Sequence, residues 1–242
     1  MFELVFKRLR ANGKLTLLVI LFLPILVSLG FWQLSRAEEK RQRLLVYQQQ
    51  QDIPAINLLD NMSRQDLAPY QLVRISGYYD HNHYWLLDNR SRGGQAGYEI
   101  IMPLVADKLR LLVNRGWLPA SMRREELPLV STPEDEVTIE GYLYPIEANP
   151  FIKHSQSDLD LAWPRRVLQL EAKAAGEALG SEVYPQLLRI DSNSPGAFTT
   201  DWKLINSGPE KHLGYAVQWF ALSLALLILY FWVLLRKNGD HE

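Results

Sequence analysis

The stretch LTLLVILFLPILVSLGFW, residues 15–32, contains 18 residues and no charged side chain. At about 1.5 Å per residue, a helix of this length spans roughly 27 Å, close to the hydrocarbon thickness of a bilayer. A second uncharged apolar run covers residues 213–235. Because a core helix of a soluble protein has a polar face and neither run shows one, both runs predict membrane-spanning helices.

The first run has some features of a signal peptide, since four cations stand between residues 7 and 14. It is longer than the usual apolar core of such a peptide, however, and no small-x-small cleavage site follows it. Trp32 and Arg36 are side chains that anchor a helix at the membrane interface. We therefore expect a retained helix, with a kink at Pro24 because membrane helices tolerate proline.

Two crossings place both chain ends on one side of the membrane and the middle of the chain on the other. Lys and Arg are nearly balanced between the flanks, so the positive-inside rule gives no decision. The basic N-terminus directly before the first span favours cytoplasmic chain ends. The predicted organisation is a cytoplasmic tail (1–14), a transmembrane helix (15–34), a periplasmic domain (35–211), a second transmembrane helix (212–235) and a cytoplasmic tail (236–242).

The middle of the chain carries mostly strand signals. Short runs rich in β-branched and aromatic residues predict strands at 72–79, 84–87, 98–104, 109–115, 137–143, 167–170 and 186–190. Helices are expected at 35–50, as an extension of the first span, and at 171–179, where Gly180 is the expected C-cap. The predicted fold class is an α+β membrane protein with two transmembrane helices flanking an antiparallel β-rich domain, a barrel or a sandwich, with one short helix.

Several functions find little support in the sequence. The net charge of −1 and the lack of a basic tract argue against nucleic acid as a partner. No nucleophile elbow, phosphate-binding glycine loop or zinc signature is present, so we do not expect an enzyme. His81 and His83 have a spacing that suits a metal, but no third ligand is evident and a loop is favoured there. We expect no metal site.

The segment NRGW, residues 114–117, resembles a site because polar, cationic and aromatic side chains follow an apolar strand. A structural role is favoured, since nothing beside it supplies a base or nucleophile. In that interpretation Gly116 permits a bend, Arg115 pairs with an acid and Trp117 packs.

Six segments in order resemble the Surfeit locus protein one family, the assembly factors of cytochrome c oxidase. They are LGFWQLSR (29–36) with Lys40, GYYDH (77–81), Gly97-Tyr98 leading to Pro103-Leu104, VNRGWLP (113–119), GYL (141–143) and HLGYAVQWF (212–220). The resemblance implies an inner-membrane protein with cytoplasmic ends and a periplasmic domain. It also implies a chaperone that receives haem a from haem a synthase and passes it to the catalytic subunit of the oxidase.

His212 is the candidate haem a ligand, because it is the histidine adjacent to a membrane span and imidazole is a common axial donor. Tyr215 and Trp219 follow at offsets that place all three near one helix face. The alternative is an interfacial anchor at His212 with an ordinary aromatic belt. Trp32, Gln33 and Arg36 suit positioning, and Arg36 suits a haem propionate or equally a lipid phosphate.

Two functions of different class therefore remain. In the first, the protein binds haem a and helps its insertion into the oxidase. In the second, it is a membrane-anchored scaffold that holds an assembling oxidase subunit without a cofactor. A membrane-tethered periplasmic enzyme is a third and weaker interpretation. Loss of His212 separates the first two, because a scaffold would be indifferent to it.

Overall fold

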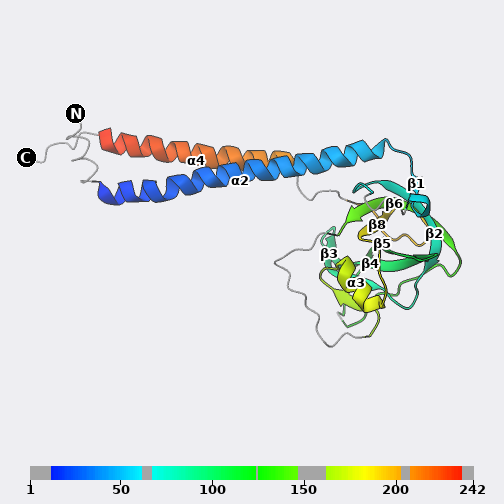
Figure 1. Ribbon diagram of the computed structural model, residues 1–242. Helices are drawn as coiled ribbons and strands as arrows, with labels where there is room; N and C mark the ends of the chain where they lie inside the picture. Colours follow the sequence, from blue (N-terminus) through cyan, green and yellow to red (C-terminus); the bar gives the residue numbers. More distant parts are fainter. Residues whose placement is uncertain (1–11, 62–66, 124, 147–161, 203–207, 236–242) are drawn as a thin grey trace, which may run out of the picture. The chain divides into compact units, whose positions relative to one another are not determined.

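The computed structural model describes the chain except residues 1–11, 62–66, 124, 147–161, 203–207 and 236–242, which include most of both predicted tails (Figure 1). The chain divides into two compact units, Met1–Leu45 with Leu204–Glu242, and Val46–Lys203. The first contains the two long apolar helices, except for the last residues of the N-terminal one, and the second contains all the strands.

The helical unit is an antiparallel pair of α2 (Gly13–Gln51) and α4 (Pro209–Leu235), drawn blue and red in Figure 1. Thr16 Oγ1 lies 3.0 Å from the hydroxyl of Tyr230 at one end of the contact. Gln33 and His212 meet at the other end. The start of α2 therefore lies beside the end of α4.

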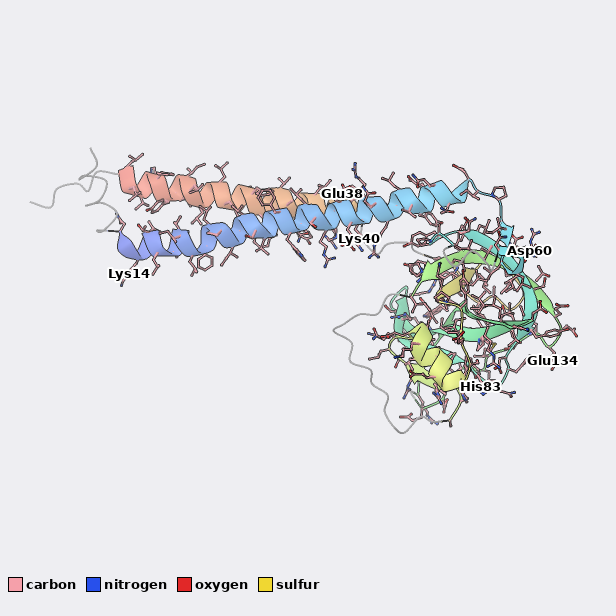
Figure 2. All side chains as sticks on the ribbon, viewed as in Figure 1. Lys14, Glu38, Lys40, Asp60, His83 and Glu134 are labelled. Atoms are coloured by element: carbon pink, nitrogen blue, oxygen red, sulfur yellow. The ribbon has the colours of Figure 1, made fainter. Side chains whose placement is uncertain are left out.

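Both helices are long and apolar enough to cross a membrane, and each exposes large apolar side chains on its outer face. Leu17 is 68% exposed and Val217 is 69% exposed, which is typical of surfaces covered by lipid. The charged residues Lys14, Glu38 and Lys40 of α2 lie before and after its apolar part (Figure 2). The helix continues through Pro24 and on to Gln51, which confirms the predicted extension over residues 35–50.

The second unit is built on one eight-stranded sheet. Its elements are β1 (Ile56–Asn57), the 3-10 helix η1 (Leu59–Asn61), β2 (Leu72–Tyr79), β3 (Trp85–Arg92), β4 (Gln95–Ala106), β5 (Leu109–Pro119), β6 (Val137–Pro145), β7 (Arg165–Val167), α3 (Ala172–Leu179) and β8 (Gln186–Ile190). The strand order is β1-β2-β6-β8-β5-β4-β3-β7, and β2 also pairs with β4. That extra pairing closes β2, β6, β8, β5 and β4 into a barrel, which confirms the predicted fold class and decides between barrel and sandwich.

Alternating side chains fill the barrel. On β6, Val137, Ile139 and Leu143 are buried as the period-two pattern predicts, and the main core gathers their counterparts from β2, β4, β5 and β8. A separate cluster packs Ala175 of α3 against the other face of the sheet, including Trp85 and Leu112. Gly180 ends α3 in the left-handed conformation with φ 64°, so the predicted C-cap is confirmed.

Two features differ from the sequence expectations. The edge strand at residues 167–170 is misplaced, because β7 covers Arg165–Val167 and pairs in parallel with β3. Its arginines carry no apolar alternation, and Arg165 stacks 4.4 Å from the centre of the Trp163 ring instead. Two further pairs, β1 with β2 and β5 with β8, are also parallel, although the other ladders are antiparallel. Gly93 and Gly94, both with positive φ, form a two-residue hairpin turn between β3 and β4.

Candidate functional site

His212 and Gln33 form the polar contact at one end of the apolar helix pair. His212 stands in the first turn of α4, and its Nδ1 lies 2.8 Å from Oε1 of Gln33 on α2. Gln33 is only 9% exposed, whereas His212 is partly buried. Gln33 comes directly after the uncharged run that begins at Leu15, so both side chains stand where the apolar segments meet polar sequence.

Trp219 shares the α2-facing side of α4 with His212, but Tyr215 is directed elsewhere. Ala216 and Ser223 are buried on this side of α4. His212 and Trp219 are both partly buried and follow the same spacing, whereas Tyr215 is 43% exposed. The structure thus brings His212 together with Gln33 and leaves Tyr215 on the outer surface of the pair.

Arg36 is engaged with its own helix. Its Nη1 donates to Oε2 of Glu39 at 2.6 Å, and this hydrogen bond lowers the pKa of the Glu39 carboxyl from its ordinary value. The guanidinium also lies 5.8 Å from the centre of the Trp32 ring. Its side chain remains 48% exposed, so the cation is accessible to an anion at the membrane surface.

His83 lies in a different setting in the second unit, where Figure 2 labels it. Its Nδ1 is 2.8 Å from Oδ2 of Asp80, and its ring meets Trp163 edge to face. His81 belongs to the tight turn between β2 and β3, which confirms the loop favoured by the sequence. In the part of the chain that the structure describes, no group of three or more His, Cys, Asp or Glu residues is arranged to hold a metal ion.

The segment 114–117 forms a bulge in β5. Opposite Glu99 and Ile101 of β4, the pairing passes from Trp117 to Asn114, so β5 has one extra residue there. Gly116 takes φ 108°, which confirms the predicted bend. Asn114 Nδ2 donates to Oε2 of Glu99 at 2.7 Å, and its Oδ1 accepts from the Gly116 amide. These bonds hold the bulge in place.

The prediction that Arg115 pairs with an acid is wrong. Arg115 is fully buried, and its donors reach the carbonyls of Gly196 and Ser131 and the hydroxyl of Thr132 at 2.6–2.8 Å. The rings of Tyr79 and Phe198 lie 4.7 and 4.8 Å from its guanidinium carbon. Burial lowers the pKa of Arg115 to about 10, since no carboxylate among its described partners offsets the desolvation. No local pattern around residue 115 indicates that carbonyls and aromatic rings would take the place of an acid.

Tyr79 gives the barrel a distinct stability profile at alkaline pH. Burial raises the pKa of its hydroxyl to about 12, and the hydroxyl donates to the Pro195 carbonyl. The pKa is higher in the folded protein than the unfolded value of about 10. The contribution of Tyr79 to the free energy of unfolding is therefore complete below pH 10 and is lost as the pH rises through 12. The shift corresponds to a loss of roughly 2–3 kcal/mol.

We therefore expect Tyr79→Phe to cost about 1 kcal/mol at pH 8, through the lost hydrogen bond. The same variant should match or exceed the wild type in stability near pH 12. Denaturant titrations of the full chain in detergent, followed by tryptophan fluorescence, measure both values. A cost that is the same at pH 8 and pH 12 would contradict a buried phenol with a raised pKa.

Comparison with known proteins places this chain in a family. The SURF1 family profile matches residues 20–224, which extend from the first apolar helix into the second. The chain belongs to the SURF1 family. All six segments that carry the sequence resemblance fall within the match, from LGFWQLSR in α2 to HLGYAVQWF at the start of α4.

Two relatives from Rickettsia match this chain over nearly its full length. A SURF1-like protein of Rickettsia felis is 32% identical over 241 residues, which are 93% of this chain and 98% of the relative. A SURF1-like protein of Rickettsia conorii is 31% identical over 90% of each chain. Surfeit locus protein 1 of Gallus gallus is 25% identical over 90% of this chain and 75% of its own length. Membership of the SURF1 family implies a function in the assembly of cytochrome c oxidase.

Proposed function

We propose that this SURF1 family protein binds haem a through His212 and helps its insertion into the catalytic subunit of cytochrome c oxidase. In this proposal the protein lies in the inner membrane with residues 1–14 and 236–242 in the cytoplasm. Residues 35–211 form the periplasmic domain, and His212 stands at the periplasmic end of the second span. Haem a synthase is the expected donor of the haem.

One observation carries the proposal: among the described residues, the imidazole of His212 is hydrogen-bonded through Nδ1, to Gln33. Its Nδ1 lies 2.8 Å from Oε1 of Gln33, and in this proposal Nε2 is the atom that binds the iron. Histidines that bind metals usually donate their other ring N–H to a protein acceptor in this manner. Imidazole is a common axial donor to haem iron, so the donor set fits the cofactor. The apolar helix pair supplies a setting suited to a macrocycle.

In this proposal, side chains near His212 also contact the haem. Trp219, on the same side of α4 as His212, offers an aromatic surface to the macrocycle. Tyr215 offers its ring and hydroxyl at the outer surface of the pair. Arg36 offers a guanidinium to a propionate, in competition with Glu39 and with lipid phosphates.

A scaffold that binds no haem is the second candidate, and one feature of the second, strand-containing unit favours it. Met122 and Leu129, in the connection between β5 and β6, are 106% and 97% exposed. Large apolar side chains that protrude from a loop suit contact with another protein. In this alternative they contact an assembling oxidase subunit, and His212 is an interfacial residue.

The two candidates are separated in a strain that lacks the gene and expresses an a-type oxidase. We expect reduced-minus-oxidised spectra of its membranes to lose the a-type band, while b- and c-type bands persist. Wild type should restore the band, and a Met122→Glu, Leu129→Glu double variant should restore it as well if haem delivery is the function. The scaffold predicts that this double variant fails. An unchanged a-type band in the deletion strain would contradict both candidates.

A further inference from the structure

The buried amide of Gln33 is unusual for its position. An uncharged polar side chain at the end of a membrane helix can reach the polar interface, yet Gln33 is turned towards α4 and is 91% buried. Its carbonyl oxygen lies 2.8 Å from Nδ1 of His212, a good hydrogen-bond distance. The Gln33 side chain is thus shielded from solvent and hydrogen-bonded across the helix pair.

This contact selects one tautomer of the histidine. An amide oxygen only accepts hydrogen bonds, so Nδ1 must carry the proton. In a neutral imidazole the other nitrogen, Nε2, then has a free lone pair. Gln33 therefore both orients the ring and presents Nε2 as the donor atom.

The helix packing keeps this arrangement in place. A Cβ at Gly30, one turn before Gln33 on the same face of α2, would lie 2.6 Å from the ring of Phe220, so that ring would have to shift. Phe31 and Phe220 also meet edge to face, with ring centres 5.3 Å apart. Gly30 and Phe220 thus bring α2 and α4 into close contact next to the Gln33–His212 pair.

We propose that Gln33 is a positioning residue that tunes His212 as an axial ligand of haem, an inference that rests on the function proposed above. A hydrogen bond from Nδ1–H raises the basicity of Nε2, and a stronger acceptor raises it further. The neutral amide therefore sets a donor strength between that of a free imidazole and that of an imidazole paired with a carboxylate. A ligand of intermediate strength suits a protein that must both hold haem and release it.

The reduction potential of the bound haem tests this role. The full chain is expressed in a host that makes haem a, purified in detergent, and titrated for the midpoint potential of the co-purified haem. Gln33→Glu places a stronger acceptor at Nδ1 and should lower the potential, because a more basic ligand stabilises ferric iron. Gln33→Leu removes the acceptor and should raise the potential. Gln218→Leu is the matched control, since Gln218 is an exposed glutamine on α4.

Opposite shifts in the two Gln33 variants, with the Gln218 control unchanged, support the positioning role, because a merely structural change would not alter the sign of the shift. Equal potentials in wild type and both variants would overturn it. If Gln33→Leu does not fold, Gln33→Glu decides alone: a lowered potential supports the role and an unchanged one overturns it. Haem retained in full by His212→Ala would refute the proposed ligand itself, a failure distinct from loss of the Gln33 effect alone.

Discussion

Replacing His212 with alanine is expected to lower the haem a that co-purifies with the full chain by at least tenfold. Replacing the axial imidazole removes its bond to the iron. Changes to residues that only hydrogen-bond to a metal ligand already cost about 10- to 100-fold in metal affinity. Absorbance of the purified protein, as haem per chain, measures the loss. In membranes of the complemented deletion strain, the a-type band should fall with it.

His81→Ala is the matched control for this experiment. His81 is an exposed histidine in the turn after β2, so its loss removes an imidazole without touching the helix pair. We expect it to keep the haem content and the a-type band of wild type. If His212→Ala kept both as well, the haem ligand would lie elsewhere or be absent. The a-type band would then depend on the soluble unit, as the scaffold requires.

The barrel was largely predictable because its strands carry local signals. The alternation of Val137, Ile139, Gly141 and Leu143 marks one buried face of β6, and the structure buries that face in the core. Gly180 marks the end of α3 because glycine readily takes the left-handed conformation that ends a helix, and the structure shows it there. Closure of the barrel was not predictable in the same way. It depends on the parallel pairing of β5 with β8 and on the pairing of β2 with β4, between strands that carry no mutual signal.

The residues of the candidate site could be picked out from the sequence, but the contact between them could not. His212 drew attention by its place next to an apolar run, and Gln33 by its place after another. Their contact joins residues separated by 179 positions, and it depends on how α2 and α4 pack at Gly30 and Phe220. Tyr215 shows the same limit, since helical spacing alone put it near His212 while the structure leaves it exposed.

Arg115→Ala is expected to destabilise the soluble unit by about 3–5 kcal/mol, a large part of the total of about 5–15 kcal/mol for a typical domain. The substitution empties a fully buried site between Tyr79 and Phe198 and removes the donors to three acceptors, two of them carbonyls. Denaturant unfolding in detergent, followed by tryptophan fluorescence, measures the change. Arg115→Lys should also lose stability, because an ammonium cannot reproduce the planar stacking and the spread of donors.

Arg123→Ala is the control for the loss of an arginine. Arg123 is 79% exposed and pairs with Glu126 at the surface, so its removal should change stability by less than about 1 kcal/mol. Arg115→Met separates packing from polar bonding, because it refills much of the volume but donates no hydrogen bond. We expect a loss smaller than that of alanine. If Arg115→Met were instead as stable as wild type, the buried cation would add no net stability, as holds for some buried charges. The acceptors that it leaves unpaired would then be satisfied in another way.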